Sequence, residues 1–277
     1  SQIAGVYLGF PHEHRTASVE WLSEYPKPYT CAIVDDDWYY EMSALRAFEK
    51  HGPAMTLQQL GEQWMVDVCG TWGSSKEARL NIAKGIQPPD CGHPRHNRSW
   101  WTIGPQFSAE IYGLIAPGKP NLAAKLAREF GHINGYAEAV DGAVFVAGAV
   151  SLAFVENDPK TIVREAAKLI HAESPYRRCL DEIIAMADAD KSFEDIERGP
   201  IERWATEYPG TNNAVANGGI IALCLWFGEG DFLKTVNLAC RISDYTDADC
   251  NAAGAAAIIG AMHGRKAIPK NLIEPLN

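Results

Sequence analysis

Apolar residues recur at the spacing of an α-helix along most of this sequence. Across residues 41–50 they stand three apart, and Gly52-Pro53 follows as a stop signal. Asn157-Asp158-Pro159 supplies a cap and a first-turn proline for another helix. Further helices are expected over residues 213–227, 231–242 and 250–262. This pattern predicts an all-α protein.

Strand signals are few. The short run 31–34 is the one β-leaning segment. Residues 86–103 carry Pro, Gly, His and Trp without periodicity, which predicts a long loop, and loops of that length are often functional. We expect this loop and the turn 9–13 to line a pocket. The expected architecture is one compact all-helical domain over residues 1–277, with ten or more helices.

Charge and cysteine content exclude several classes of protein. The chain has 277 residues, a hydrophobic content of 47% and a net charge of −10, so it can bury a sizeable core but lacks the basic face of a nucleic-acid-binding protein. Seven cysteines stand singly, without a CxxC pair, which argues against a disulfide framework or a zinc site and fits a reducing cytoplasm. We expect no signal peptide and no membrane span.

Three adjacent carboxylates, Asp35-Asp36-Asp37, stand directly before an amphipathic helix. Because they repel one another, water, the positive end of the helix dipole or a cation must offset their charge. Acidic caps exposed to solvent are common, so this run alone leaves open whether it binds a ligand.

A second acidic pair, Asp247 and Asp249, precedes a helix of small apolar residues that should be deeply buried. Two acids at a buried helix start are costly unless they bind a cation or find hydrogen-bond donors. Carboxylate oxygens suit Mg²⁺, Mn²⁺ or Ca²⁺ better than zinc. Two clusters could hold two ions if the fold brings both helix starts together.

These motifs resemble those of the ADP-ribosylglycohydrolase superfamily, which includes dinitrogenase-reductase-activating glycohydrolases and J1 crystallins. Val34-Asp35-Asp36-Asp37 stands for the early Thr-Asp-Asp-Thr motif, and Thr246-Asp247-Ala248-Asp249-Cys250 for the late Gly-Asp-Thr-Asp-Thr motif. Gly9-Phe10-Pro11-His12-Glu13 fits the second half of the N-terminal motif, and the middle segments 103–118 and 131–147 also match.

The resemblance implies hydrolysis of a glycosidic bond at a ribose-like sugar, with an ADP-ribosyl group or a related nucleoside or glycoside as substrate and two Mg²⁺ ions as cofactors, Mn²⁺ being an alternative. It implies catalytic roles for Asp36, Asp37, Asp249 and Glu13. The expected metal ligands are Asp35, Asp36, Asp37, Asp247, Asp249 and Cys250. The expected substrate-binding residues are Gln106, His132, Asn134 and Trp38. The general base, the leaving group and the oligomeric state stay open.

Cys250 departs from the family motif, which has threonine there. Since a thiol is a soft ligand and Mg²⁺ prefers oxygen, we expect one ion to bind more weakly than the other. Cys250 also favours one alternative, a non-catalytic crystallin-like or ligand-sensing relative. A second alternative is a Mg²⁺-dependent terpenoid synthase, because residues 157–165 match its Asn-Asp-x-x-Ser/Thr-x-x-x-Glu motif. Pro159 argues against it, since that motif must lie inside a helix.

Overall fold

The computed structural model describes residues 1–13, 20–31, 35–67, 70–210, 212–242 and 246–276. Within these ranges the chain forms helices joined by turns and loops, and no strand; one isolated antiparallel bridge joins Thr102 and Asn213. The predicted all-α class is confirmed. The β-leaning run at 31–34 lies outside the described residues except for Cys31.

Eleven helices of the described chain have eight residues or more. They are α1 (Gln2–Gly9), α2 (Asp36–His51), α3 (Leu57–Asp67), α4 (Gly73–Ala83), α7 (Pro120–Phe130), α8 (Glu138–Ala153), α9 (Pro159–Ala167), α10 (Pro175–Asp188), α13 (Ala214–Gly228), α14 (Phe232–Cys240) and α15 (Ala248–His263). Shorter helices connect them: α5 (Gly104–Phe107), α6 (Glu110–Leu114), α11 (Phe193–Ile196), α12 (Glu202–Glu207) and α16 (Lys270–Ile273). Single turns of 3-10 or π-helix complete the chain, among them η1 (Phe10–His12) and η3 (Asp90–Gly92).

The helix signals in the sequence act where they were expected. Helix α2 ends at Gly52, whose positive φ of 72° suits glycine. The side chain of Asp158 accepts hydrogen bonds from two backbone amides at the start of α9, and Pro159 is the first residue of that helix. Asn213 and Asp231 cap α13 and α14 in the same way. These four boundaries are confirmed.

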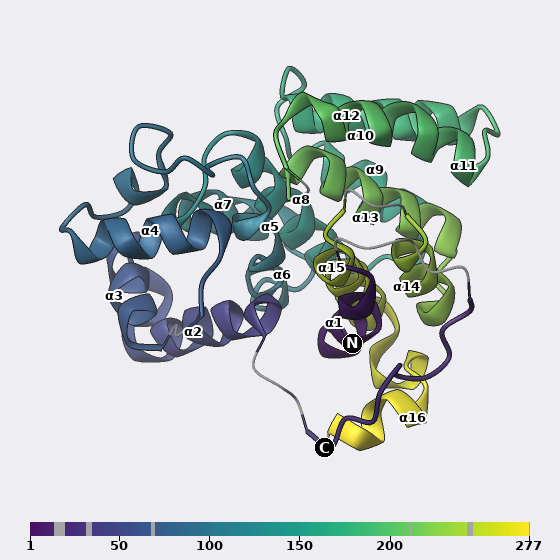
Figure 1. Cartoon of the computed structure of the whole chain (residues 1–277), viewed down its shortest axis with the longest axis horizontal. Coiled ribbons are helices and arrows are strands. Elements are labelled where there is room, and N and C mark those ends of the chain that lie inside the picture. The colour runs from purple at the N-terminus through teal and green to yellow at the C-terminus, as the bar shows by residue number, and fades with distance from the viewer. Residues whose placement is uncertain (14–19, 32–34, 68–69, 211, 243–245, 277) are drawn as a thin grey trace.

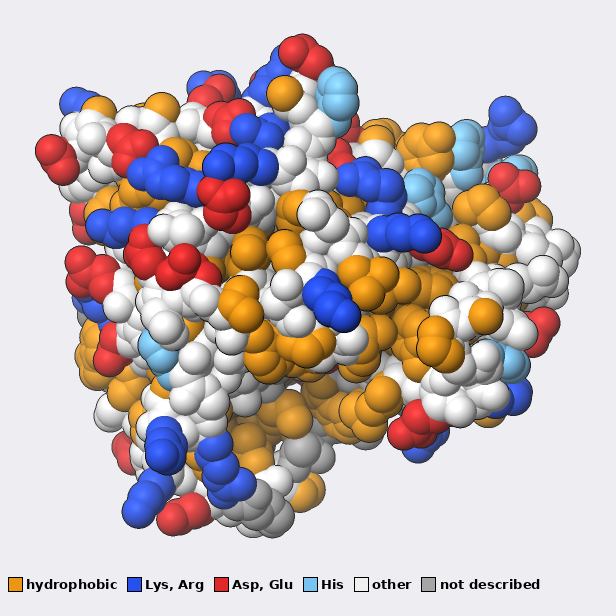
Figure 2. Space-filling model, turned by 180° about the vertical axis from the view of Figure 1, so that it is seen from behind, with side chains coloured by type: hydrophobic (Ala, Val, Ile, Leu, Met, Phe, Trp, Pro, Cys, Tyr) orange, Lys and Arg blue, Asp and Glu red, His pale blue; other side chains and the backbone are white. Residues whose placement is uncertain are grey.

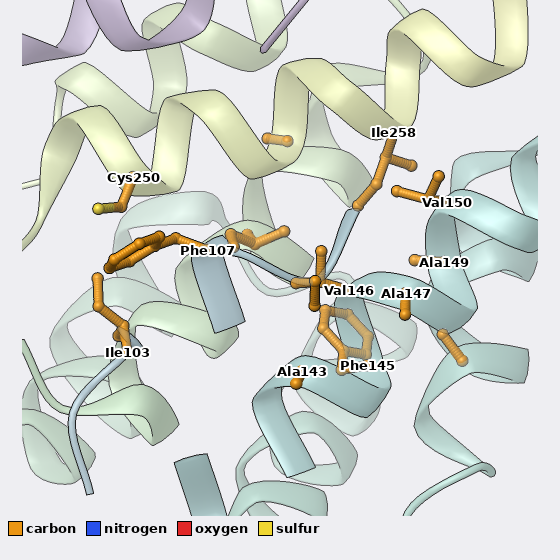
Figure 3. Close-up of a cluster of buried hydrophobic side chains, with 14 of the residues drawn as sticks. Ile103, Phe107, Ala143, Phe145, Val146, Ala147, Ala149, Val150, Cys250 and Ile258 are labelled. Atoms are coloured by element: carbon orange, nitrogen blue, oxygen red, sulfur yellow. The ribbon is translucent and has the colours of Figure 1, made fainter. Parts of the chain in front are cut away.

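Three nearly apolar helices, α8, α13 and α15, form the centre of the core. Residues 143–150 of α8 are all buried, as are residues 214–226 of α13 and 248–259 of α15. Side chains of α8 and α15 meet around Val150 and Ile258 (Figure 3). In Figure 1, α2, α3 and α4 lie to the left of this centre, and α14 lies to its right. The residues of these helices are mostly small and apolar on every face, so the helices are buried on all sides. This burial fixes the positions of their first turns.

Helix α1 approaches α15 so closely that two of its residues must be glycine. A Cβ atom on Gly5 would lie 2.4 Å from the carbonyl oxygen of Ala252, and one on Gly9 would lie 2.6 Å from Cα of Asp249. Both distances are shorter than real Cβ contacts. This close packing places the segment that follows α1, which includes Glu13, next to the first turn of α15.

The face seen from behind the view of Figure 1 carries hydrophobic side chains across its middle, with Lys and Arg interspersed among Asp and Glu around them (Figure 2). On the part of this face that the structure describes, we see no broad basic surface of the kind that binds nucleic acid. Among the described helices, none is both long enough and apolar enough to cross a membrane.

Candidate metal centre

The first turns of α2 and α15 carry the acidic residues that the sequence singled out. Asp35 caps α2, and its Oδ1 atom accepts a hydrogen bond from the backbone N–H of Asp37 at 3.1 Å. Asp247 directly precedes α15, and Asp249 lies in its first turn. A helix N-terminus carries partial positive charge, which favours carboxylates at both places.

The fold brings these two helix starts together. One oxygen each of Asp37 and Asp249 and the Sγ atom of Cys250 lie within 4.8 Å of one another. Oxygens of Glu13, Asp247 and Asp249 form a second set within the same limit. Since Asp249 belongs to both sets, the two groups of donor atoms are neighbours that share one carboxylate.

A pocket of about 520 Å³ opens onto these groups. Acidic residues form one side, and the other walls come from the start of α4, from α5 and from the segment before α13. The lining consists of Phe10, Glu13, Asp35, Asp36, Tyr39, Gly70, Trp72, Gly73, Ser74, Ser75, Thr102, Ile103, Gly104, Phe107, Asn212, Asp247, Asp249 and Cys250. Figure 3 shows the side chain of Cys250 next to the ring of Phe107, with Ile103 on the other side of that ring, so the thiol adjoins an apolar wall.

Burial and mutual repulsion raise the pKa values of these acids. Burial, followed by the charges of Asp35 and Asp247, raises the pKa of Asp36 to about 7. Burial is also the main reason that the pKa values of Asp37 and Asp249 lie well above the usual range. Among the described residues that line the pocket, none is Lys or Arg. The carboxylates therefore need protons or cations to balance their charge.

The surroundings of Asp37 indicate whether these residues fit a metal ion. The residue is 1% exposed, and apart from the thiol of Cys250 beside it, neither carboxylate oxygen has a hydrogen-bond partner in the described structure. A buried carboxylate with so few donors is costly, and a divalent cation held between Asp37 and Asp249 would remove that cost. Burial and the surrounding acids raise the pKa of Cys250 as well. The donor set fits a metal ion.

An asparagine that sequence reasoning missed holds the start of α15 in place. Oδ1 of Asn217, in the first turn of α13, accepts hydrogen bonds from the backbone N–H of Asp247 at 3.1 Å and from Nδ2 of Asn251 at 2.8 Å. Asn212 donates a hydrogen bond to the carboxylate of Asp247. Asn217 is a polar residue in the apolar run 214–228, and that contrast was the available signal.

Several separate segments contribute the other wall residues. Ser74 and Ser75 begin α4, Thr102 precedes α5, and Tyr39 comes from α2, with its hydroxyl donating to the carbonyl oxygen of Gly70. Trp72 lies at the pocket and is 64% exposed. No spacing rule connects these positions, because only tertiary packing brings them together.

The four predicted substrate-binding residues do not line the pocket. Gln106 is buried, and its Oε1 atom accepts a hydrogen bond from the hydroxyl of Tyr176 at 2.9 Å. Asn134 donates to Oγ of Ser75 at 2.9 Å, so it holds a wall residue from behind. Trp38 is half-buried outside the lining.

His132 faces a different part of the surface. It lies in a shallow depression with Lys125, Arg128 and Lys168, and its Nδ1 atom is 2.6 Å from the carbonyl oxygen of Arg128. Burial lowers the pKa of His132. Its position gives no support to the predicted contact with substrate.

The loop 86–103 mainly supports the residues that line the pocket and forms little of the lining itself. Of its residues only Thr102 and Ile103 line the pocket, and of the turn 9–13 only Phe10 and Glu13 do. Asn97 is fully buried and donates to the carbonyl oxygen of Ser74 at 2.9 Å. The expectation that the whole loop forms the wall was too broad. Its buried middle holds the start of α4 instead.

The terpenoid synthase alternative is not supported by the structure. Asp158 caps α9 by accepting hydrogen bonds from the backbone of Lys160 and Thr161, and Pro159 begins that helix. The residues of the matching motif therefore span a helix boundary and cannot share one helical face as metal ligands.

Comparisons with known proteins agree with the geometry. A search of curated proteins finds no match. A solved structure described as an ADP-ribosylglycohydrolase-related protein complex superposes with a TM-score of 0.65, covering 100% of this chain and 92% of that chain at 16% sequence identity, which shows a shared fold. The family model of ADP-ribosylglycohydrolase matches residues 2–277. From this match over nearly the whole sequence, we conclude that the chain belongs to the ADP-ribosylglycohydrolase family.

Proposed function

We propose that this protein is a metal-dependent glycosidase that cleaves the bond at the anomeric carbon of a ribose-like sugar, with an ADP-ribosyl group or a related nucleoside or glycoside as substrate. Membership in the family supports a glycohydrolase function. The observation that carries the metal dependence is the meeting of two donor sets on Asp249, at the bottom of a pocket without Lys or Arg among its described lining residues.

Two divalent ions fit these donors. Asp37, Asp249 and Cys250 would hold one ion, and Glu13, Asp247 and Asp249 the other. Asp35 and Asp36 line the same pocket and would add negative charge around both positions. When bound, the ions supply positive charge for the hydroxyl groups of the sugar and lower the pKa of water. Mg²⁺ is the proposed ion, with Mn²⁺ as an alternative, because most of the donors are carboxylate oxygens.

The chain's own groups would orient the sugar and exclude water. Hydroxyls of Ser74, Ser75 and Thr102 can donate to or accept from a sugar, and aromatic side chains such as Phe107 form apolar walls. Glu13 is the proposed general base, through the carboxylate oxygen that would not hold the ion. It lines the pocket and can accept a proton from the attacking water, while Asp249 holds the charge beside it.

A turnover assay tests this function. The purified chain is incubated with ADP-ribosyl-arginine, an ADP-ribosyl-serine peptide and simple nucleosides, with Mg²⁺, with Mn²⁺ or with a chelator, and release of the sugar product is measured by chromatography. We expect turnover of at least one substrate that the chelator abolishes. Asp249→Asn should reduce the rate by roughly 100-fold or more, as for removal of one group that stabilises a transition state.

Asp181→Asn is the matched control, because Asp181 is an exposed acid on α10 that pairs with Arg177. It should leave the rate unchanged. Turnover that persists in the chelator would contradict the metal dependence. Binding of ADP-ribose without any turnover would favour the non-catalytic alternative instead.

A further inference from the structure

Cys250 gives one of the two donor sets a chemistry that the other lacks. Its Sγ atom lies within 4.8 Å of oxygens of both Asp37 and Asp249, and it lines the pocket. The second set, Glu13, Asp247 and Asp249, consists of carboxylate oxygens alone. One pocket therefore holds a set with sulfur beside a set with only oxygen, and Asp249 joins them.

The buried carboxylate of Asp37 indicates that the sulfur-containing set is built for a ligand. Apart from the thiol of Cys250 beside it, neither of its oxygens has a hydrogen-bond partner in the described structure, and the side chain is almost fully buried. Hydrogen bonds hold the neighbouring groups in place: the backbone N–H of Cys250 donates to Oδ1 of Asp249 at 2.9 Å, and the side chain of Gln2 donates to the backbone carbonyl oxygen of Asp37 at 2.8 Å. The set thus has fixed donors and a buried carboxylate whose neighbouring donor is the thiol of Cys250.

The spacing suits a small divalent ion. Zinc–sulfur distances are about 2.3 Å and zinc–oxygen distances about 2.0–2.2 Å, so ligand atoms around a tetrahedral ion lie roughly 3.5 Å apart. Donors within 4.8 Å of one another reach that spacing by small side-chain rotations. Because Asp249 and Cys250 both line the pocket, a fourth position stays open toward it.

We propose that Cys250 binds the ion of the Asp37–Asp249–Cys250 set through sulfur. The sulfur makes this position selective for a borderline ion such as Zn²⁺ or Co²⁺ over Mg²⁺, while the all-oxygen position binds a hard ion. Thiolates favour zinc and similar ions, whereas carboxylates suit Mg²⁺ and Mn²⁺. The centre is then a mixed-metal one, in which a zinc-like ion replaces the Mg²⁺ of the proposed function at this one position. This inference rests on the metal centre of the proposed function, and it holds whether or not the protein turns over a substrate.

Cobalt spectroscopy tests the inference without an activity assay. Metal-free protein is titrated with Co²⁺, and the near-ultraviolet charge-transfer absorption that arises from a bond between thiolate and cobalt is recorded. We expect this absorption in the native protein and in Cys31→Ser, which replaces an exposed cysteine. It should vanish in Cys250→Ser, although calorimetry should still show cobalt binding there through oxygen donors.

Competition between Zn²⁺ and Mg²⁺ gives a second readout. Cys250→Thr should reduce the preference for zinc by roughly tenfold or more, since even substitution of groups around a metal ligand changes affinity by about 10–100-fold. Absence of the sulfur band in native protein that binds cobalt would overturn the inference, and so would a band that survives in Cys250→Ser. If no divalent ion binds the native protein, the metal centre of the proposed function fails together with this inference.

Discussion

Glu41 and Glu110 form a buried acid pair behind the metal centre, and this pair makes a sharp prediction about stability and pH. Glu41 lies on α2 and is 7% exposed, and Glu110 begins α6 and is 1% exposed. Oε1 of Glu41 accepts a hydrogen bond from the backbone N–H of Ile111 at 2.9 Å. Neither oxygen of Glu110 accepts a hydrogen bond in the described structure, but a protonated Glu110 can donate to Glu41.

The pair should carry a proton at neutral pH. Burial, followed by the charge of Glu41, raises the pKa of Glu110 well above its ordinary value of 4.5, and burial raises the pKa of Glu41 to about 7. The charge of Asp37 adds to the raised pKa of Glu110, and burial, followed by the charge of Glu41, raises the pKa of Tyr112. Because the folded state binds this proton more tightly than the unfolded state, its contribution to stability is fully present below pH 4.5 and is lost as the pH rises toward the folded pKa.

Glu110→Gln isolates the effect, because the neutral amide keeps a donor without a titrating proton. One proton taken up on folding corresponds to about 1.4 kcal/mol per pH unit. Between about pH 5.5 and about pH 7.5 the native protein should therefore lose roughly 3 kcal/mol more of its free energy of unfolding than Glu110→Gln does. The assay is urea unfolding in the presence of a chelator across this range.

The exposed acid Glu62 provides the control, since Glu62→Gln should follow the native protein at every pH. Parallel pH curves for native protein and Glu110→Gln would refute the reasoning, because Glu110 would then be ionised in the folded state or would not be buried as described.

Three further predictions address packing, support of the site and the pocket wall. Gly5→Val should destabilise the fold by about 2 kcal/mol or more in urea unfolding, because its Cβ would meet the carbonyl of Ala252 at 2.4 Å; an unchanged midpoint would contradict the close approach of α1 and α15. Asn217→Ala should weaken binding of divalent ions by roughly 10–100-fold in calorimetry, because Asp247 loses a partner that holds it; unchanged affinity would show that Asn217 does not support the site. Trp72→Ala should raise KM with little change in kcat or Tm, since this side chain is largely exposed at the pocket; a large fall in Tm would mean that Trp72 is structural.

The sequence was sufficient to predict the fold class and the acidic side of the pocket. Caps such as Asp158 and Asn213 act locally, so their effect on helix boundaries can be read from neighbouring residues. The clusters at 35–37 and 247–249 stand at helix starts, and the resemblance to the family predicted that these starts meet. The structure brings Asp37 and Asp249 together, whereas their roles as ligands stay predictions.

The rest of the pocket depends on packing between distant segments. Ser74 lines it because Asn97 binds its carbonyl oxygen, and Asn217 reaches Asp247 because α13 packs against α15. No local pattern contains such contacts. His132 shows the same dependence on packing, since the sequence places it after a helix end, and the end of α7 leads it to a part of the surface away from this pocket.

The central claim is that two ions bind side by side on Asp249, and diffraction from crystals grown with Mn²⁺ tests it most directly. Anomalous scattering should show two peaks roughly 3.5–4 Å apart, as in other two-metal sites, one near Asp37 and one near Glu13, with the carboxylate of Asp249 between them. Asp249→Asn crystals should lose both peaks. Peaks elsewhere on the molecule, or ordered crystals in saturating Mn²⁺ without a peak beside Asp249, would contradict the account.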